Sequence, residues 1–211
     1  MKNIKLYDPF SMDRLNRLYL VRHGQVLRYN GMAAFGQTDV DITEVGNLQM
    51  QYLAERLRFV NIKAIYSSDL KRSVTGARII ARYHDVPHAI MPDLKEIFFG
   101  YWEGMSKTEI DKDYPGELEK RQADIVNYHP PGNGESISDL SGRVMPCLQS
   151  IMEEQKGNDI LLVAHGEVNR IIICKALGLE LANIFSIHQD YGCLNIIDYF
   201  PNYALIRLMN G

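Results

Sequence analysis

Two apolar runs of the chain end in the same pair of residues, a histidine followed by a glycine. The first run, 17–22, leads into His23-Gly24, and the second, 159–163, leads into His165-Gly166. Both runs are apolar nearly throughout, which predicts strands covered on both faces of a sheet. Packing does not require a histidine at such a strand end, so the repetition indicates chemistry.

Between and after these runs, the spacing of apolar positions alternates between that of helices and that of strands. Helices are expected over residues 43–59, 68–83, 136–155 and 168–177, and further strands over 63–67, 89–92, 193–200 and 203–208. Thr43 is expected to cap the first helix, and Ser68 or Asp69 the second. Gly178 is expected to end the last helix. The alternation predicts an α/β fold of three layers, α/β/α, with a mostly parallel central sheet.

Residues 98–135 break this alternation. They hold the only tryptophan, a charged helical stretch over 106–119, and a turn rich in Pro and Gly. We therefore expect a single domain over residues 1–211, with 98–135 as a small inserted lid and 1–16 as an irregular lead-in.

Composition narrows the classes of partner. The formal net charge of −3 argues against a nucleic-acid binder that relies on general electrostatic attraction. No apolar run has membrane-spanning length, and residues 1–16 lack the apolar core of a signal peptide, so no membrane partner is expected. The three cysteines, Cys147, Cys174 and Cys193, lie far apart and are typical of buried thiols in a reducing compartment, which predicts a cytoplasmic protein.

Side chains that can do chemistry follow three of the expected strands. Arg22 and His23 follow the first strand, Arg72 lies in the first turn of the helix after the second, and His165 follows the late strand. Gly24 would let the backbone approach a ligand. Ligands of open α/β sheets bind at this carboxyl edge, and guanidinium groups beside a helix N-terminus favour a phosphoryl group. Each residue alone also fits an ordinary turn, so the prediction depends on their conjunction.

Cleavage of a phosphate ester also requires an acid for the leaving group. Glu96 is the candidate, because it lies among apolar residues, where a protonated carboxyl is easier to hold. Glu103 is its nearest rival, and the alternative for Glu103 is a carboxylate that braces a turn.

Five separated motifs occur together in the chain. They are Leu20-Val21-Arg22-His23-Gly24, Ser67-Ser68-Asp69-Leu70-Lys71-Arg72, Glu96 with Phe99-Gly100-Tyr101-Trp102-Glu103-Gly104, Gly134-Glu135-Ser136, and Val163-Ala164-His165-Gly166. In this order, over roughly residues 17–200, they resemble the histidine phosphatase superfamily, the phosphoglycerate-mutase-like group. The resemblance implies a phosphoglycerate-mutase-like fold and a small phosphorylated substrate.

The resemblance also assigns roles residue by residue. His23 would attack phosphorus and form a phosphohistidine. Arg22, Arg72 and His165 would hold the phosphoryl oxygens and stabilise the charge that develops on them. Glu96 would protonate the departing alkoxide and then activate the water that hydrolyses the intermediate.

Further site residues follow from the same resemblance. Gly36 and Gln37 would lie near the substrate. No metal and no organic cofactor is implied. His84 and His88 are four residues apart, but Pro87 disfavours the helix that would align them as metal ligands.

Among the departures from the family pattern, two concern Val26 and Glu167. Val26 stands three residues after the nucleophile, where Ser or Thr is common, and removes a hydroxyl from the pocket edge. Glu167 stands where a small or amide residue is frequent. Pointing inward, Glu167 would repel an acidic substrate, so it joins the candidate substrate-binding residues. Both departures bear on specificity and leave the phosphoryl pocket intact.

The sequence leaves three functions open. The first is a phosphomonoesterase. Within that branch, the segments 22–26 and 165–170 resemble α-ribazole phosphatase-like members, which suggests α-ribazole 5′-phosphate as substrate, while a broad-specificity phosphatase also fits. The second is a 2,3-bisphosphoglycerate-dependent phosphoglycerate mutase, which the acidic residues of 98–135 disfavour. The third is an inactive phospholigand-binding protein, which would usually have lost His23 or Glu96. A homodimer also stays open.

Overall fold

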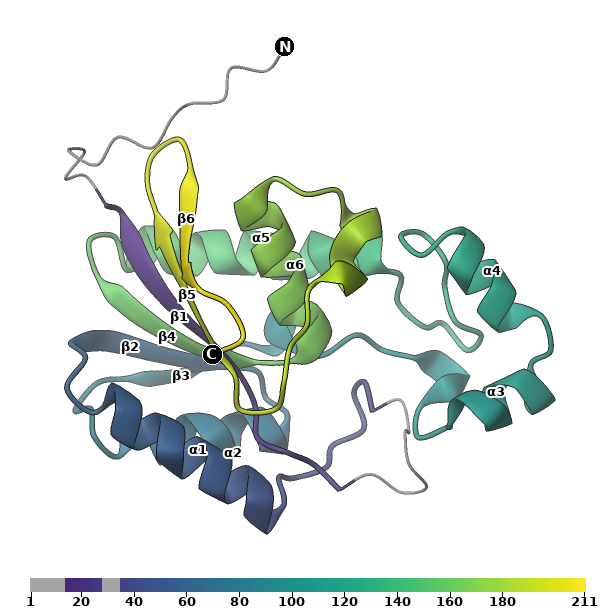
Figure 1. Ribbon diagram of the computed structural model, residues 1–211, viewed down its shortest axis with the longest axis horizontal. Coiled ribbons are helices and arrows are strands. Elements are labelled where there is room, and N and C mark those ends of the chain that lie inside the picture. Colours follow the sequence, from purple (N-terminus) through teal and green to yellow (C-terminus); the bar gives the residue numbers. More distant parts are fainter. Residues whose placement is uncertain (1–13, 28–34) are drawn as a thin grey trace.

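Six strands form one sheet in the part of the chain that the computed structural model describes, residues 14–27 and 35–211 (Figure 1). They are β1 (Asn16–Arg22), β2 (Ile62–Ser67), β3 (His88–Ile90), β4 (Asp159–Ala164), β5 (Leu194–Tyr199) and β6 (Ala204–Leu208). Their order is β3-β2-β4-β1-β5-β6. The first four in that order are parallel, whereas β5 and β6 pair antiparallel. The predicted, mostly parallel sheet is thus confirmed. Of the expected lead-in over 1–16, residues 1–13 lie outside the described residues.

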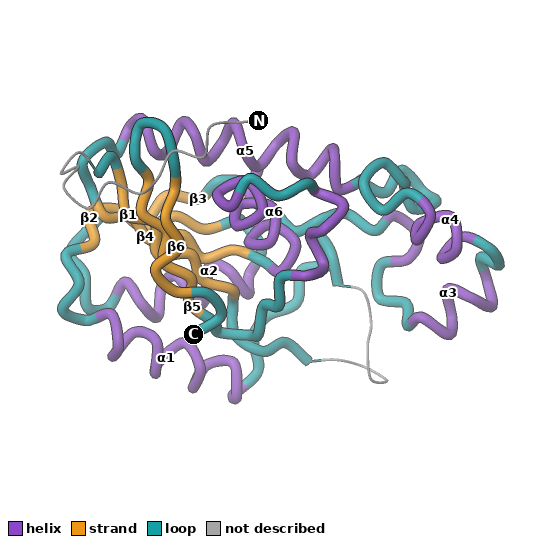
Figure 2. Tube along the Cα trace, turned by 45° about the horizontal axis from the view of Figure 1, so that its top comes forward, coloured by secondary structure: helices purple, strands orange, loops and turns teal. Residues whose placement is uncertain are grey.

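Helices cover both faces of the sheet. Their bounds are α1 (Glu44–Leu57), α2 (Lys71–Ala81), α5 (Ile137–Glu154) and α6 (Gly166–Leu177). One face is covered by α1 and α2 and the other by α5 and α6 (Figure 1 and Figure 2). The predicted three layers are therefore confirmed. None of the helices in the described part of the chain combines the length and apolar character needed to cross a membrane.

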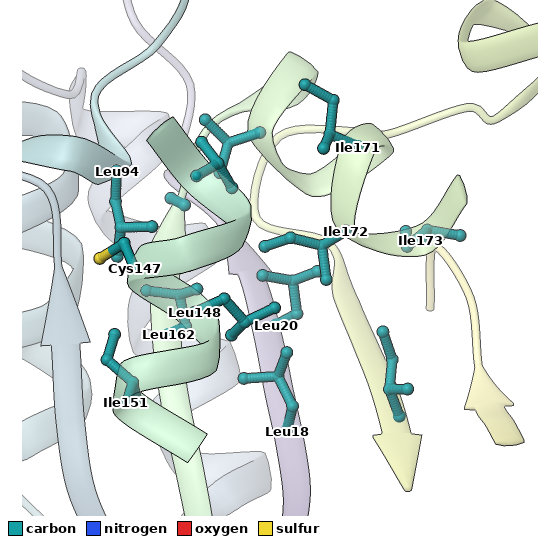
Figure 3. Close-up of a cluster of buried hydrophobic side chains, with 14 of the residues drawn as sticks. Leu18, Leu20, Leu94, Cys147, Leu148, Ile151, Leu162, Ile171, Ile172 and Ile173 are labelled. Carbon is teal, nitrogen blue, oxygen red and sulfur yellow. The ribbon is translucent and has the colours of Figure 1, made fainter. Parts of the chain in front are cut away.

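Alternate residues of β1 pack against the two helix layers. Leu18 and Leu20 pack in the cluster under α5 and α6, whereas Tyr19 and Val21 pack in the cluster under α1 and α2. Figure 3 shows Leu148 of α5 beside Leu20. Because both faces of the strand are buried, the run has no polar face, as its sequence predicts. The residues that follow β1 are thereby held by a rigid core.

The pairing of β1 with β4 brings the two histidines together. The strands are parallel, with Arg22 opposite Ala164. The backbone N–H of His23 donates to the carbonyl oxygen of Ala164 at 3.1 Å, which continues the ladder past the strand. Since both strands end at the same edge, His23 and His165 leave the sheet side by side, with ring centroids 5.1 Å apart.

The helix ends agree with the sequence at two points and differ at a third. The Thr43 hydroxyl caps α1 by accepting a backbone N–H of its first turn at 3.0 Å, and Gly178 ends α6 with φ of 68°. The prediction that Ser68 or Asp69 caps α2 is wrong. Leu70 occupies the N-cap and no side chain caps the helix. The hydroxyl of Ser68 is used elsewhere, in the site described below.

Residues 98–135 lie to one side of the sheet and its covering helices (Figure 1). They contain η3 (Gly100–Trp102), α3 (Lys107–Asp113) and α4 (Glu117–Ala123); η2 (Pro92–Leu94) precedes them and η4 (Leu181–Ser186) follows α6. The charged helical stretch expected over 106–119 consists of two short helices, because the chain turns at Gly116 with φ of 82°. The ring of Trp102 is buried and stacks on Tyr128 at 5.7 Å.

Candidate active site

His23 leaves the carboxyl end of β1 with its ring tethered by the next residue. Its Nδ1 lies 2.8 Å from the carbonyl oxygen of Gly24. A carbonyl only accepts, so Nδ1 carries the hydrogen and Nε2 keeps its lone pair. Burial, together with the charges of Arg72 and Arg22, lowers the pKa of this imidazole well below its usual value. His23 is therefore a neutral ring with a nucleophilic Nε2.

His165 is the second imidazole, at the N-cap of α6. The hydroxyl of Ser68 accepts the backbone N–H of Leu70 at 3.3 Å and lies 2.7 Å from Nε2 of His165. We assign the hydroxyl hydrogen to Nε2, which places the imidazole hydrogen on Nδ1. Burial, and then the charge of Arg72, lowers the pKa of His165. Nδ1 is buried and has no partner among the described residues, so it is an N–H donor available to a ligand.

Arg22 is held in one orientation by two contacts. Its guanidinium carbon lies 4.0 Å from the centre of the Tyr191 ring, and Nη1 donates to the carbonyl of Gln189 at 2.6 Å. The same tyrosine ring lies 5.5 Å from the ring of His23. Nε of Arg22 is buried without a partner in residues 14–27 and 35–211, which makes it a second available donor.

Arg72 lies in the first turn of α2, as predicted, and its side chain is buried. Nη1 donates to the carbonyl of Thr38 at 2.8 Å, and Nη2 donates to the carbonyl of Gly36. Burial lowers the pKa of the guanidinium, and the carboxyls of Glu96 and Glu103 oppose that effect. Arginine stays charged under such shifts, and this charge acts on both imidazoles.

Glu103 braces the turn that holds Arg72. Its Oε1 accepts the backbone N–H groups of Gln37 and Phe99 at 2.8 and 3.1 Å, and Oε2 accepts those of Gly36 and Thr38 at 3.2 and 3.0 Å. All four of these donors belong to the backbone, so the side chain of Glu103 ties the two loop segments together. The turn-bracing alternative thus describes Glu103. Gly36 and Gln37 lie in the braced turn, and their contact with substrate stays a prediction.

Glu96 lies in a buried position between two backbone donors. Its Oε1 accepts the N–H of Ile97 at 3.0 Å, and its Oε2 accepts that of Glu167 at 3.3 Å. Burial, and then the neighbouring charge of Glu167, raises its pKa well above the usual value. The side chains of Gln37 and Arg143 donate to its carbonyl oxygen at 3.2 and 2.9 Å. The raised pKa favours the protonated form of the Glu96 carboxyl, and its hydrogen bonds hold it firmly.

Glu167 faces Glu96 and pairs with Arg170 of its own helix at 3.2 Å. Burial by itself would raise the pKa of Glu167. The hydrogen bond to Glu96 and the charges of Arg170 and Arg22 outweigh burial and lower the pKa instead. The structure thus places this predicted substrate-binding residue against the candidate acid.

Three further residues of the site carried no clear signal in the sequence. Ser68 was expected to cap a helix, and Tyr191 lies in a loop without a recognisable pattern. Arg143 binds Glu135 through Nε and Nη2 at 2.7 and 2.8 Å, and reaches the carbonyl oxygen of Glu96. The one feature of the sequence that pointed to a cation here was Glu135, because a carboxylate that becomes partly buried on folding needs a cation beside it.

A cavity of about 490 Å³ shares Tyr191 with the site, because the ring of Tyr191 lines the cavity and lies 5.5 Å from the ring of His23. It is lined by Gln25, Val26, Leu27, Thr43 and Tyr191. Val26 is buried in this wall and pairs with residue Ile42 in an isolated bridge. The departure from the family pattern at this position therefore lies at a cavity that a substrate's alcohol part could enter.

The candidate metal ligands of the sequence are placed apart from this site. His88 lies in β3, with its Nε2 2.9 Å from the Ser67 hydroxyl. His84 follows the C-terminal end of α2. Within the described ranges, no group of three or more His, Cys, Asp or Glu residues is placed to hold a metal ion.

Known proteins share this arrangement of sequence and fold. The chain is 28% identical to the adenosylcobalamin/alpha-ribazole phosphatase of Escherichia coli strain K12 over 204 residues, 92% of this chain and 96% of that protein. It is 35% identical to a metal-independent phosphoserine phosphatase of Arabidopsis thaliana, over 75% of this chain and 67% of that protein. The crystal structure of the alpha-ribazole phosphatase from Shigella flexneri superposes with a TM-score of 0.85 at 28% identity, over 92% of this chain and 96% of that one.

Two arginines, two neutral imidazoles and a carboxyl with a raised pKa at one sheet edge suit the transfer of a phosphoryl group. The sequence model described as the histidine phosphatase superfamily (branch 1) matches residues 18–211, nearly the whole described chain. The chain therefore belongs to the histidine phosphatase superfamily, branch 1.

Proposed function

We propose that the chain hydrolyses a phosphomonoester of a small metabolite through a phosphohistidine on Nε2 of His23. Because the named relatives in the superfamily are phosphatases, the chain is a hydrolase that acts on phosphate esters. The observation that carries the phosphohistidine is the 2.8 Å contact between Nδ1 of His23 and the Gly24 carbonyl. That contact leaves the opposite ring nitrogen as the nucleophile.

In the first step, Nε2 of His23 attacks phosphorus and the bond from phosphorus to the ester oxygen breaks. The leaving oxygen takes the proton of Glu96 as it departs. Arg22, Arg72 and Nδ1 of His165 bind the phosphoryl oxygens, on which negative charge develops. Nε of Arg22 and Nδ1 of His165 support this assignment, because neither atom has a partner among the described residues and buried donors require an acceptor.

In the second step, Glu96 acts as the base. Its carboxylate takes a proton from a water molecule as the water oxygen attacks phosphorus, and the bond between phosphorus and Nε2 of His23 breaks. Phosphate leaves, His23 returns as a neutral imidazole, and Glu96 is protonated again. The same carboxyl thus serves both steps, in opposite protonation states.

For the substrate we propose α-ribazole 5′-phosphate, a nucleotide-like ester, which would place the enzyme in cobalamin assembly. Relatives named for this compound align with nearly the whole chain. The cavity beside His23 offers polar groups at Gln25 and Thr43 and an apolar wall at Val26, as an uncharged alcohol part requires. Phosphoserine is the second candidate, because the Arabidopsis relative is the more identical one. A broad-specificity phosphatase would accept both.

The remaining functions have less support. A mutase that holds a doubly charged substrate needs a surplus of cations in the segment 98–135. Its two helices carry more acidic than basic residues: Glu109, Asp111, Asp113, Glu117 and Glu119 against Lys107, Lys112, Lys120 and Arg121. An inactive phospholigand-binding protein does not need a nucleophile and an acid, and the chain has both.

We further propose that the segment 98–135 is a lid, since Arg121 of α4 acts electrostatically on Glu167 of the site. The expected partner is a small phosphorylated molecule, with neither nucleic acid nor membrane involved. A cytoplasmic location is supported by the cysteines, all three of which are free and buried. The single domain over 1–211 and the homodimer stay predictions.

The test is a phosphate-release screen over α-ribazole 5′-phosphate, phosphoserine, sugar phosphates and phosphoglycerates, with a mutase assay beside it. Substitution His23→Ala should abolish release and the acid-labile phosphoenzyme. The matched control is His84→Ala, at the opposite end of α2 from Arg72, and it should retain activity. Full activity of the His23→Ala variant would contradict the phosphohistidine.

A further inference from the structure

Two carboxyl groups, those of Glu96 and Glu167, meet inside the site. They come from the loop after η2 and from the first turn of α6. The backbone N–H of Glu167 donates to Oε2 of Glu96 at 3.3 Å, which brings the two carboxyls next to each other in a buried position. Two adjacent carboxylates repel each other when both are ionised, so the site favours one hydrogen on the pair.

Glu167 has the charges that favour its ionised form. Arg170 of the same helix pairs with it at 3.2 Å, and Arg170 is itself fixed by donating from Nε to the carbonyl of Ile187 at 2.8 Å. The guanidinium groups of Arg22, the last residue of β1, and Arg121, in α4, act on the same carboxylate. Three cations from three elements thus surround Glu167.

Glu96 has fewer compensating charges. Arg72 faces it from α2, whereas Arg143 of α5 reaches its backbone carbonyl rather than its carboxyl. Burial and the adjacent carboxylate of Glu167 both oppose ionisation and raise the pKa of Glu96. The hydrogen therefore belongs to Glu96 and the negative charge to Glu167.

We propose that Glu167 is a positioning residue for the phosphatase reaction: its carboxylate, fixed by Arg170, holds the Glu96 carboxyl in place and keeps a proton on it. This inference rests on the proposed function, in which Glu96 is the acid and then the base. An ordinary glutamate is ionised at neutral pH and has no proton to give. The adjacent charge of Glu167 keeps Glu96 protonated before the first step and favours the return of the proton from water in the second.

The direct test is the titration of the Glu96 carboxyl by NMR in protein that carries 13C-labelled glutamate, with Glu96→Gln to assign the resonance. In Glu167→Gln the midpoint should fall by about one pH unit or more, because a like charge has been removed. Glu167→Asp should restore it towards the wild-type value. Glu154→Gln, an exposed glutamate at the far end of α5, is the matched control and should leave it unchanged.

The kinetic test is the alkaline limb of kcat/KM for an alkyl phosphomonoester. In Glu167→Gln the midpoint of this limb should shift to lower pH by as much as the NMR midpoint does, and in Glu167→Asp it should return towards the wild-type value. The loss of kcat/KM on p-nitrophenyl phosphate should be smaller than on the alkyl ester, because its leaving group needs little protonation. Glu167→Ala is a second neutral variant in case Glu167→Gln does not fold.

Two outcomes separate the inference from the proposed function. An unchanged NMR midpoint in both neutral variants of Glu167, with a wild-type enzyme that hydrolyses esters, overturns the inference and leaves the phosphatase intact. A wild-type enzyme that releases no phosphate from any ester overturns the proposed function, and the role of Glu167 in the reaction falls with it.

Discussion

The hydroxyl of Ser68 lies 2.7 Å from Nε2 of His165, and with the serine as donor in this contact the ring hydrogen lies on Nδ1. Ser68 follows β2 and His165 follows β4, two strands that are neighbours in the sheet. The contact therefore joins two strand ends at the same edge. It directs Nδ1–H of His165 towards the space between the arginines, where a phosphoryl oxygen would be bound.

Removing this hydroxyl should lower kcat while leaving the fold intact. In Ser68→Ala, the imidazole of His165 can adopt either neutral form, and the donor on Nδ1 is partly lost. A hydrogen bond of this kind is worth about 1 kcal/mol, so we expect a loss of roughly five- to tenfold in kcat. The matched control is Ser67→Ala, whose hydroxyl binds His88 instead. Equal losses in the two variants, measured by steady-state phosphate release, would contradict the assignment.

The buried imidazoles should make stability fall as the pH is lowered. Folding lowers the pKa of His23 and His165 below 6.5, so between that value and the folded pKa the unfolded chain binds more protons than the folded one. Each histidine then removes about 1.4 kcal/mol of unfolding free energy per pH unit of decrease. His165→Gln should reduce the slope by that amount, measured by urea unfolding between pH 6.5 and 5.

Glu96 should change the pH dependence of the unfolding free energy in the opposite direction, which provides an internal check. Its folded pKa is raised, so its stabilising contribution is present below the ordinary value of 4.5 and is lost as the pH rises towards the folded pKa. Glu96→Gln should therefore steepen the dependence on pH over the same interval in which His165→Gln flattens it. The same direction of change in both variants would contradict these protonation states.

The layers and the residues at the sheet edge could be predicted from the sequence because they depend on short-range patterns. The four residues 18–21 are Leu, Tyr, Leu and Val, so this run needs cover on both faces, and His23 and His165 follow directly from strands that end at one edge. Arg72 could be placed for the same reason, from its position just after β2.

Other parts of the site could not be predicted, because they depend on which loops meet in space. The turn around Gly36 is held by Glu103, 67 residues later in the chain. Nothing local distinguishes such a brace from an acid. The pairing of Glu96 with Glu167 also arises only when α6 begins at Gly166, two residues earlier than its hydrophobic pattern indicates. Helix starts are poorly fixed by periodicity, since the first turn is free to carry polar residues.

The clamp between Arg143 and Glu135 should affect both stability and the acid. Arg143 makes two bonds to Glu135 and donates to the carbonyl oxygens of Asp93, Lys95 and Glu96, so it holds the loop that carries the acid. Substitution Arg143→Lys keeps the charge and loses the planar fork. We expect a loss of about 1–3 kcal/mol in unfolding free energy and a larger loss of kcat for poor leaving groups than for p-nitrophenyl phosphate.

The control for this clamp is an exposed arginine that pairs with a glutamate. Arg58 pairs with Glu55 at 3.1 Å at the end of α1, where both side chains are about half exposed. Arg58→Lys should change unfolding free energy by less than about 0.5 kcal/mol, because solvent-exposed pairs contribute little. Comparable losses in the two variants, measured by denaturant unfolding, would show that Arg143 acts only as a surface charge.

Gly24 should be intolerant of even one added methyl group, and for a reason other than room for a ligand. A Cβ at Gly24 would lie 2.4 Å from the carbonyl oxygen of Gly46, where the first turn of α1 packs against the end of β1. Gly24→Ala must therefore push α1 outward and displace His23, at a cost of about 1–3 kcal/mol in unfolding free energy and with a loss of kcat.

Gly142→Ala is the matched control, because a Cβ there meets nothing within 4 Å and α5 gains a better helix former. It should be neutral or raise stability by up to about 1 kcal/mol in the same denaturant unfolding experiment. Equal behaviour of the two variants would mean that α1 does not pack this closely against the strand that carries His23.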